Sequence, residues 1–165
     1  MSPLYWANVT VHLLAAMVWL GGMFFLALVG APVLRGVDPP SLRARLFQRI
    51  GVRFRAVGWI AIAVLLATGV ANLAFRGLLS WNALASGEFW GSRYGTTLAW
   101  KLALVAAMVG ISAVHDFVEG PRAARLPPGS SEAIRARRRS AWLARINAGL
   151  GLALVYVAVR LARGG

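Results

Sequence analysis

The chain has 165 residues, of which 59% are hydrophobic and only 14% are charged. Soluble domains carry about 25% charged residues, so this composition indicates a membrane protein. There is no cysteine, which excludes disulfides, thiolate-ligated iron–sulfur clusters and cysteine-bound structural zinc.

Four long apolar stretches predict four transmembrane helices. The hydrocarbon core of a bilayer is about 30 Å thick and takes about 20 helical residues to cross. The predicted spans cover residues 6–33, 57–75, 96–114 and 142–159. Backbone polar groups in lipid must be satisfied within the chain, so the spans are expected to be helices. The sequence therefore predicts an all-α, integral membrane four-helix bundle, with residues 1–165 forming one domain.

The first span has the position of a signal peptide but not its other features. No basic residue precedes it, its apolar run is longer than that of a signal peptide, and it contains His12. We expect this span to be retained.

The net charge of +13 is distributed unevenly between the two sides of the predicted spans. Six arginines lie between the first and second spans and six between the third and fourth, with a seventh, Arg145, at the edge of the fourth span, against four on the opposite side. The positive-inside rule then places both basic segments in the cytoplasm and both termini outside. We expect a multi-pass protein of the cell (inner) membrane, and no nucleic-acid partner.

Both basic segments also carry apolar residues at helical spacing, such as Leu42, Leu46 and Ile50. They are expected either to lie at the headgroup boundary or to extend the spans into the cytoplasm. In both cases they attract anionic lipid, at about 1 kcal/mol per cation. Segments 36–41 and 126–131 are rich in proline and glycine and are predicted to be turns.

Two ionisable residues lie inside otherwise apolar spans: His12 in the first, and Lys101, the only lysine of the chain, in the third. Such a group costs about 2.5–3.5 kcal/mol in a membrane, so it needs a partner or a function. At 1.5 Å per residue, His12 lies roughly 10 Å below the outer end of its span and Lys101 roughly 8–9 Å. Thr68 and Asn72 of the second span lie near the same level.

This pair can bind a metal or a haem. Imidazole is a common ligand of iron, copper and zinc, and a neutral amine can also ligate iron. A haem b between the first and third helices would use both His12 and Lys101 as axial ligands. The residues expected to line the pocket or support the ligands are Trp19, Thr68, Asn72 and Met108. Two alternatives stay open: His12 can simply link helices by a hydrogen bond, and Lys101 can extend its ammonium group to the outer interface.

His115 belongs to a different level of the membrane. It lies fourteen residues beyond Lys101, which is about 21 Å further toward the cytoplasm. There it is level with Asn147 of the fourth span, and the two form a second possible site. The alternative is that His115 has no catalytic or ligand-binding role and is simply stabilised by solvent and by the dipole at a helix C-terminus.

Several short motifs, taken in order, resemble the superfamily that holds the HemJ-type protoporphyrinogen oxidases and the copper-resistance D (CopD) membrane domain. The motifs are His12-x6-Trp19-Leu20-Gly21-Gly22-Met23-Phe24-Phe25, Leu66-Ala67-Thr68-Gly69, Tyr94-Gly95-Thr96, Trp100-Lys101-Leu102, His115 and Arg145-Ile146-Asn147. The Gly-Gly-Met-Phe-Phe and Tyr-Gly-Thr stretches are more similar to the CopD branch. In addition, Ala148 follows Asn147 where HemJ-like sequences usually have glutamate.

The resemblance implies a four-helix bundle that binds haem b, with His12 and Lys101 at the positions of the family's candidate ligands. HemJ-like proteins are implicated in oxidising protoporphyrinogen IX, and CopD-like proteins in copper handling. We therefore expect a haem b-binding protein that acts in electron transfer or in porphyrinogen oxidation. If it is an enzyme, it is expected to be a haem-dependent membrane oxidoreductase. The alternatives are a copper-handling membrane protein and a non-catalytic accessory subunit of a larger respiratory or photosynthetic complex. A homo-oligomer is a further expectation.

Overall fold

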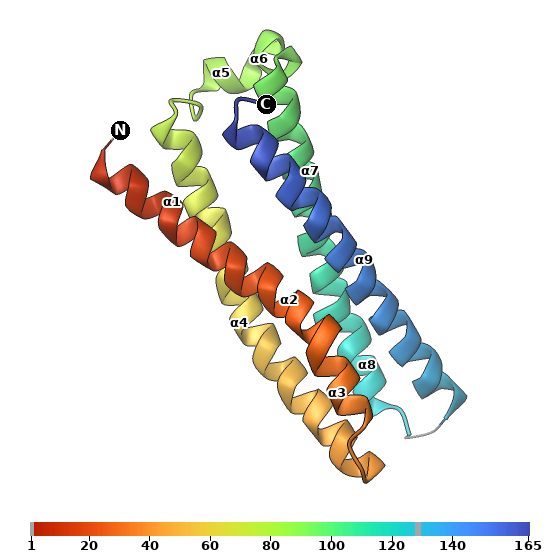
Figure 1. Ribbon diagram of the computed structural model, residues 1–165. Coiled ribbons are helices and arrows are strands. Elements are labelled where there is room, and N and C mark those ends of the chain that lie inside the picture. Colours follow the sequence, from red (N-terminus) through yellow and green to blue (C-terminus); the bar gives the residue numbers. More distant parts are fainter. Residues whose placement is uncertain (1, 128–129) are drawn as a thin grey trace. The chain divides into compact units, whose positions relative to one another are not determined.

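The computed structural model describes residues 2–127 and 130–165. Most of these residues are helical, and none of them forms a strand. The chain divides into two compact units, Met1–Ala85 and Ser86–Gly165. Each unit contains two long helices that run side by side in opposite directions (Figure 1).

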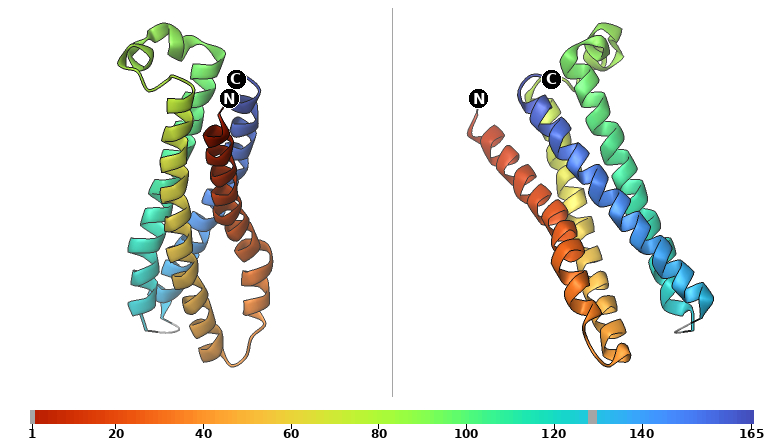
Figure 2. Two further views of the ribbon diagram at one scale, coloured as in Figure 1. Left: turned by 90° about the vertical axis from the view of Figure 1, so that its left-hand side faces the viewer. Right: turned by 45° about the vertical axis from the view of Figure 1, so that its right-hand side comes forward.

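The first unit begins with a long helical rod from Pro3 to Arg35. Its segments are α1 (Pro3–Ala16), a π-helical segment (Met17–Gly21), α2 (Gly22–Phe25), a second π-helical segment (Leu26–Gly30) and α3 (Ala31–Arg35). Ser2 starts the rod, because its hydroxyl accepts a hydrogen bond from the backbone N–H of Tyr5. The rod packs against α4 (Pro40–Phe75), and the short α5 (Trp81–Ala85) ends the unit (Figure 2).

The second unit is built around α7 and α9. Its segments are α6 (Gly87–Gly91), α7 (Arg93–Ala113), a π-helical segment (Val114–Glu119), α8 (Gly120–Arg125) and α9 (Ser131–Ala162). Serines start both long helices: the Ser92 hydroxyl accepts from the N–H of Gly95, and the Ser130 hydroxyl accepts from the N–H of Ala133. The two helices pack along their length.

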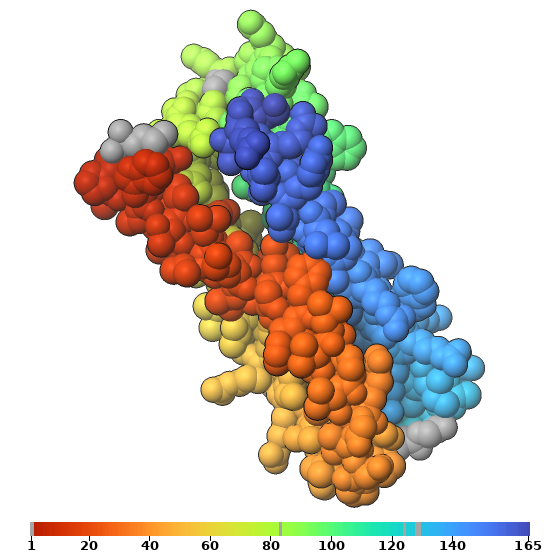
Figure 3. Space-filling model, in the orientation of Figure 1, coloured from red at the N-terminus to blue at the C-terminus, as the bar shows by residue number. Residues whose placement is uncertain are grey.

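Four helices are long and apolar enough to cross a membrane: Pro3–Arg35, Pro40–Phe75, Arg93–Ala123 and Ser131–Ala162. Large apolar side chains are exposed along them, including Leu14, Leu28, Ile60, Trp100 and Leu152. Figure 3 shows one face of these helices, with the first span in red to orange. A surface this apolar fits a lipid environment, because exposing apolar side chains to hydrocarbon, unlike exposing them to water, has no free-energy cost. The predicted all-α membrane fold is therefore confirmed.

The two basic segments are helical and continuous with the spans. α4 starts at Pro40 and α9 at Ser131, well before the predicted apolar spans begin at residues 57 and 142. The 36 residues of α4 make a rod of about 54 Å, longer than the hydrocarbon core requires. Of the two alternatives left open by the sequence, the structure has the helical extension of the spans.

The predicted turn at 36–41 is shorter than expected. The chain is non-helical only from Gly36 to Pro39, and the side chain of Arg43 closes the turn by donating from Nη1 to the carbonyl of Arg35 (3.1 Å). Proline is accommodated in the first helical turn, where its missing N–H is not needed, so Pro40 begins α4. The other predicted turn, at 126–131, includes residues 128 and 129, which lie outside the described residues.

Candidate functional site

In the first unit, His12 of α1 lies directly against Thr68 of α4. The distance between His12 Nδ1 and Thr68 Oγ1 is 2.7 Å. Thr68 is 9% exposed and His12 is half-buried. α1 and α4 run in opposite directions and pack together as a hairpin, which brings the start of the first helix beside the end of the second. The intramembrane imidazole thus has a defined polar partner.

The contacts of Thr68 favour one tautomer of His12. Thr68 Oγ1 lies 2.6 Å from the carbonyl oxygen of Val64 and 3.3 Å from that of Leu65, both in α4. A carbonyl oxygen only accepts, so the hydroxyl of Thr68 donates to Val64 and its oxygen accepts from His12 Nδ1–H. In this tautomer a neutral imidazole has its lone pair on Nε2. Proteins orient metal-ligating histidines in this way, through a hydrogen bond donated by the other ring nitrogen.

Asn8 belongs to the same polar cluster, and the sequence analysis did not single it out. Its Nδ2 donates to the carbonyl of Thr68 and to Oδ1 of Asn72, both at 3.0 Å. Asn8 and His12 are four residues apart on α1, as Thr68 and Asn72 are on α4, so each pair shares one helix face. That spacing was the signal that could have identified Asn8. We call these four residues, Asn8, His12, Thr68 and Asn72, the His12 cluster.

Two glycines of α4 leave room beside aromatic side chains of the first span. A Cβ at Gly69 would lie 3.7 Å from Cε1 of His12, and a Cβ at Gly58 would lie 3.8 Å from Cδ1 of Trp19. Trp19 itself is only 4% exposed and lies in the π-helical segment Met17–Gly21. Helical turns of this type are often found near functional sites. An alanine would fit at either glycine, but a larger side chain would press on the ring.

The second unit carries the other predicted pocket residues. Lys101 is half-buried on α7, and Met108, two turns further along the same helix, is fully buried. Both lie on the face of α7 that also contains Ser112. The pairing of Lys101 with His12 stays a prediction.

His115 and Asn147 bond to different partners. Asn147 is buried and donates from Nδ2 to Oγ of Ser112 (2.9 Å), which links α9 to α7. His115 lies 2.9 Å from Oδ1 of Asp116, its neighbour in the chain. Its side chain is 36% exposed. Asn147 thus links α9 to α7, whereas His115 belongs to the more open π-helical segment after α7, and a second site formed by these two residues stays a prediction.

The comparisons with known proteins show the family. The copper resistance protein D (CopD) family matches residues 48–161, which is more than half of the chain. An uncharacterized protein of Aquifex aeolicus (strain VF5) is 34% identical over 154 residues, covering 93% of this chain and 92% of the relative. The chain belongs to the CopD family. No solved structure matches it significantly.

The CopD match places the predicted site residues in two groups. Thr68, Asn72, Lys101, Met108 and the pair His115 and Asn147 lie within the matched residues 48–161, whereas the first span precedes them. His12, Asn8 and Trp19 are contributed by that first span. The His12 cluster thus joins a helix outside the matched region to a helix inside it.

The donor atoms of this CopD chain limit the kind of metal site it can form. Among the described residues, no group of three or more His, Cys, Asp or Glu side chains is placed to hold a metal ion. The His12 cluster offers one imidazole nitrogen and several amide and hydroxyl groups. An imidazole can serve as one ligand of a copper ion, or of a haem iron that receives four ligands from the porphyrin.

Proposed function

We propose that this CopD-family membrane protein handles copper, with His12 as the residue that contacts the metal. The observation that carries the proposal is the family match over residues 48–161. Copper in this role is a cargo that the protein binds and passes on. Imidazole is a common copper ligand.

The His12 cluster supports this role through the orientation of the imidazole. Thr68 holds the ring through Nδ1, and Nε2 is the nitrogen that we propose contacts the cation. Thr68 is itself held by Val64 and by the backbone contact to Asn8. A site with a single strong ligand is suited to release as well as to binding.

A second candidate function is haem b-dependent electron transfer or porphyrinogen oxidation. The observation that favours it is the single oriented imidazole, because a haem needs only one or two protein ligands. His12 would hold the iron through Nε2, and Lys101 is the proposed second axial ligand on the ground of its depth in the third span. Trp19 and Met108 would then be wall residues. A bound haem would supply one-electron chemistry.

We further infer the placement of the chain in the cell (inner) membrane. The arginine-rich halves of α4 and α9 would face the cytoplasm, and both termini would face outward. Anionic lipid at the cytoplasmic surface is the proposed partner of those arginines. We also propose that the chain assembles as a homo-oligomer or within a larger membrane complex through its exposed apolar helix surfaces.

The test is a metal analysis and an absorption spectrum of the detergent-purified protein. After loading with Cu(I) under a reductant, a copper-handling protein is expected to retain about one copper per chain and to show no Soret band. A Soret band in protein from haem-sufficient cells, without retained copper, would overturn the first proposal in favour of the second. The absence of both would contradict both and leave the accessory-subunit alternative.

A further inference from the structure

The first unit carries positive charge that it does not neutralise itself. Residues 1–85 contain seven arginines and one acidic residue, Asp38. Residues 86–165 contain ten arginines and Lys101, but also four acidic residues. The net charges of the two units are therefore similar, +6 and +7, but the first unit has only one carboxylate to set beside its seven arginines.

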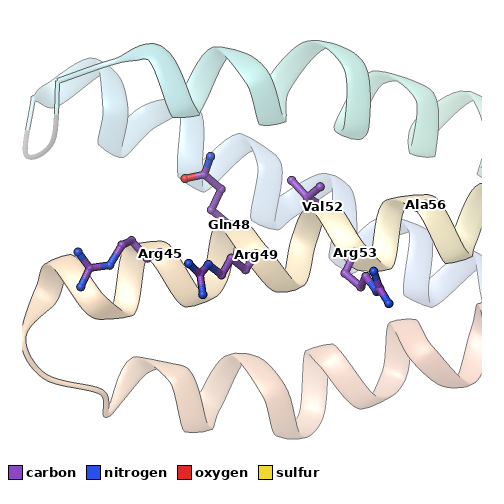
Figure 4. Close-up of a pocket in the computed structure, with 6 residues that line it drawn as sticks. All are labelled: Arg45, Gln48, Arg49, Val52, Arg53 and Ala56. Carbon is purple, nitrogen blue, oxygen red and sulfur yellow. The ribbon is translucent and has the colours of Figure 1, made fainter.

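The arginines of α4 line a groove of about 510 Å³. Its lining residues are Arg45, Gln48, Arg49, Val52, Arg53 and Ala56. Figure 4 shows the three arginines spaced along one helix, with Gln48 and Val52 projecting from a neighbouring row. Because four helical residues rise about 6 Å, the arginine row is about 12 Å long.

Within the described residues, none of these three arginines has an ion-pair partner. A small pocket of the second unit is different, because Glu119 and Glu132 line it together with Arg122, Arg135 and Arg139. The second unit thus supplies carboxylates beside its own arginines. The α4 groove is lined only by cations, one amide and small apolar side chains.

The groove also lies at the depth of phospholipid headgroups. The apolar part of α4 covers residues 57–75, which is about 28 Å of helix and matches the hydrocarbon core. Arg53 is therefore one turn outside the core, and Ala56 lies at its border. A ligand that contacts Arg45, Arg49 and Arg53 and also Val52 and Ala56 is polar at one end and apolar at the other.

We propose that the α4 groove binds the headgroup of a membrane phospholipid that carries two phosphates, of the cardiolipin type. Guanidinium groups bind phosphate oxygens in pairs, so one phosphate engages two successive arginines and a second phosphate engages the third together with the Gln48 amide. The glycerol groups then lie on Val52 and Ala56, where the acyl chains enter the core. This inference rests on the proposed cytoplasmic placement of α4, but it does not depend on which metal the His12 cluster binds.

The experiment is a native mass spectrometry titration of the detergent-purified protein with cardiolipin, phosphatidylglycerol and phosphatidylethanolamine. Wild-type protein is expected to retain one cardiolipin in preference to the other two lipids. The triple variant Arg45→Gln/Arg49→Gln/Arg53→Gln is expected to bind cardiolipin about a hundredfold more weakly, because each cation near a membrane surface contributes about 1 kcal/mol. Copper or haem content, measured on the same samples, should stay at the wild-type value.

A matched control removes the same charge elsewhere. In Arg135→Gln/Arg138→Gln/Arg139→Gln, three arginines of α9 are replaced, two of which line the pocket that has its own carboxylates. This control is expected to bind cardiolipin within about twofold of wild type, because its α4 groove is intact. Equal losses in both triple variants, or full binding in the α4 variant, would overturn the proposal. Displacement of cardiolipin by equimolar pyrophosphate would show that the groove takes soluble anions and would overturn the lipid assignment.

Discussion

The two hairpins each contain a polar contact between two helices, but the contacts differ in kind. In the first hairpin, His12 meets Thr68, and Asn8 bridges the Thr68 carbonyl and Asn72. In the second, Asn147 donates to Ser112, a contact between two groups with no titratable proton in the physiological range. The first contact orients a ring that can bind a metal, whereas the second only links two helices.

The hairpins also differ in the space beside one glycine of each: Gly69 lies next to His12, whereas Gly95 lies next to Phe89, 17 residues from Ser112. A Cβ built at Gly69 would lie at an ordinary van der Waals distance from the His12 ring, so the backbone of α4 does not crowd the imidazole. Gly95 of α7, in contrast, lies directly against the backbone carbonyl of Phe89. We infer that the second hairpin is packed for rigidity near its loop, and that the first preserves space next to a reactive side chain.

The largest effect is expected from Gly95→Ala. A Cβ at this position would overlap the Phe89 backbone, and backbone cannot move aside as a side-chain tip can. We expect the free energy of unfolding to fall by about 3 kcal/mol, the upper part of the range for overpacking. Thermal unfolding in detergent measures it. Gly69→Ala, where a Cβ fits, should change stability by less than about 0.5 kcal/mol; equal effects of the two substitutions would remove the contrast between the hairpins.

Thr68→Val tests whether the first contact serves binding. It keeps the shape of the side chain but leaves His12 Nδ1 without its oriented acceptor. Loss of such a supporting partner typically lowers metal affinity by about 10- to 100-fold. Titration with Cu(I), or haem retention, measures the change. Ser112→Ala removes the corresponding hydroxyl of the second hairpin and should leave affinity unchanged; a similar loss there would show that the effect is general destabilisation.

A double-mutant cycle of Ser112→Ala and Asn147→Leu tests the structural role of the second contact. Hydrogen bonds between membrane helices couple by about 0.6 kcal/mol on average and at most about 1.7. We expect a coupling in that range for the free energy of unfolding, because both groups are buried. Unfolding in mixed micelles gives all four stabilities. A coupling near zero would mean that the two helices are held by apolar packing alone.

Asn8→Ala is expected to have the smallest effect. Asn8 contacts Thr68 only through its backbone carbonyl, so the hydroxyl that orients His12 stays in place. Its loss should weaken metal or haem binding by about two- to threefold, near the low end of a net hydrogen bond. The same titration measures it. A loss as large as that of Thr68→Val would show that Asn8 itself orients the imidazole.

The sequence predicted the helices better than it predicted their ends. The apolar runs identified all four spans, because lipid demands a minimum length of apolar helix. The arginine-rich halves of α4 and α9 are amphipathic, which is compatible with a surface helix as well as with an extended span, so the sequence left both open. No local pattern in the sequence predicted the π-helical segments at Met17–Gly21, Leu26–Gly30 and Val114–Glu119.

The candidate site was partly predictable for a similar reason. His12 and Lys101 stand out because a charge or an imidazole is rare in an apolar span. Depth alone put Thr68 near His12, but the 2.7 Å contact depends on how α1 and α4 are rotated about their axes. Asn8 was overlooked because it lies near the end of its span, where a polar residue is inexpensive, although its spacing from His12 was informative.

The most direct test of the account compares the two histidines of the chain. His12→Ala removes the oriented imidazole, whereas His115→Ala removes a half-exposed one that bonds to Asp116. Copper and haem content of both purified variants are measured beside the wild type. The account predicts that His12→Ala loses the bound metal or haem and that His115→Ala retains it. Full occupancy in His12→Ala, or an equal loss in both variants, would contradict the assignment of His12 as the metal-binding residue.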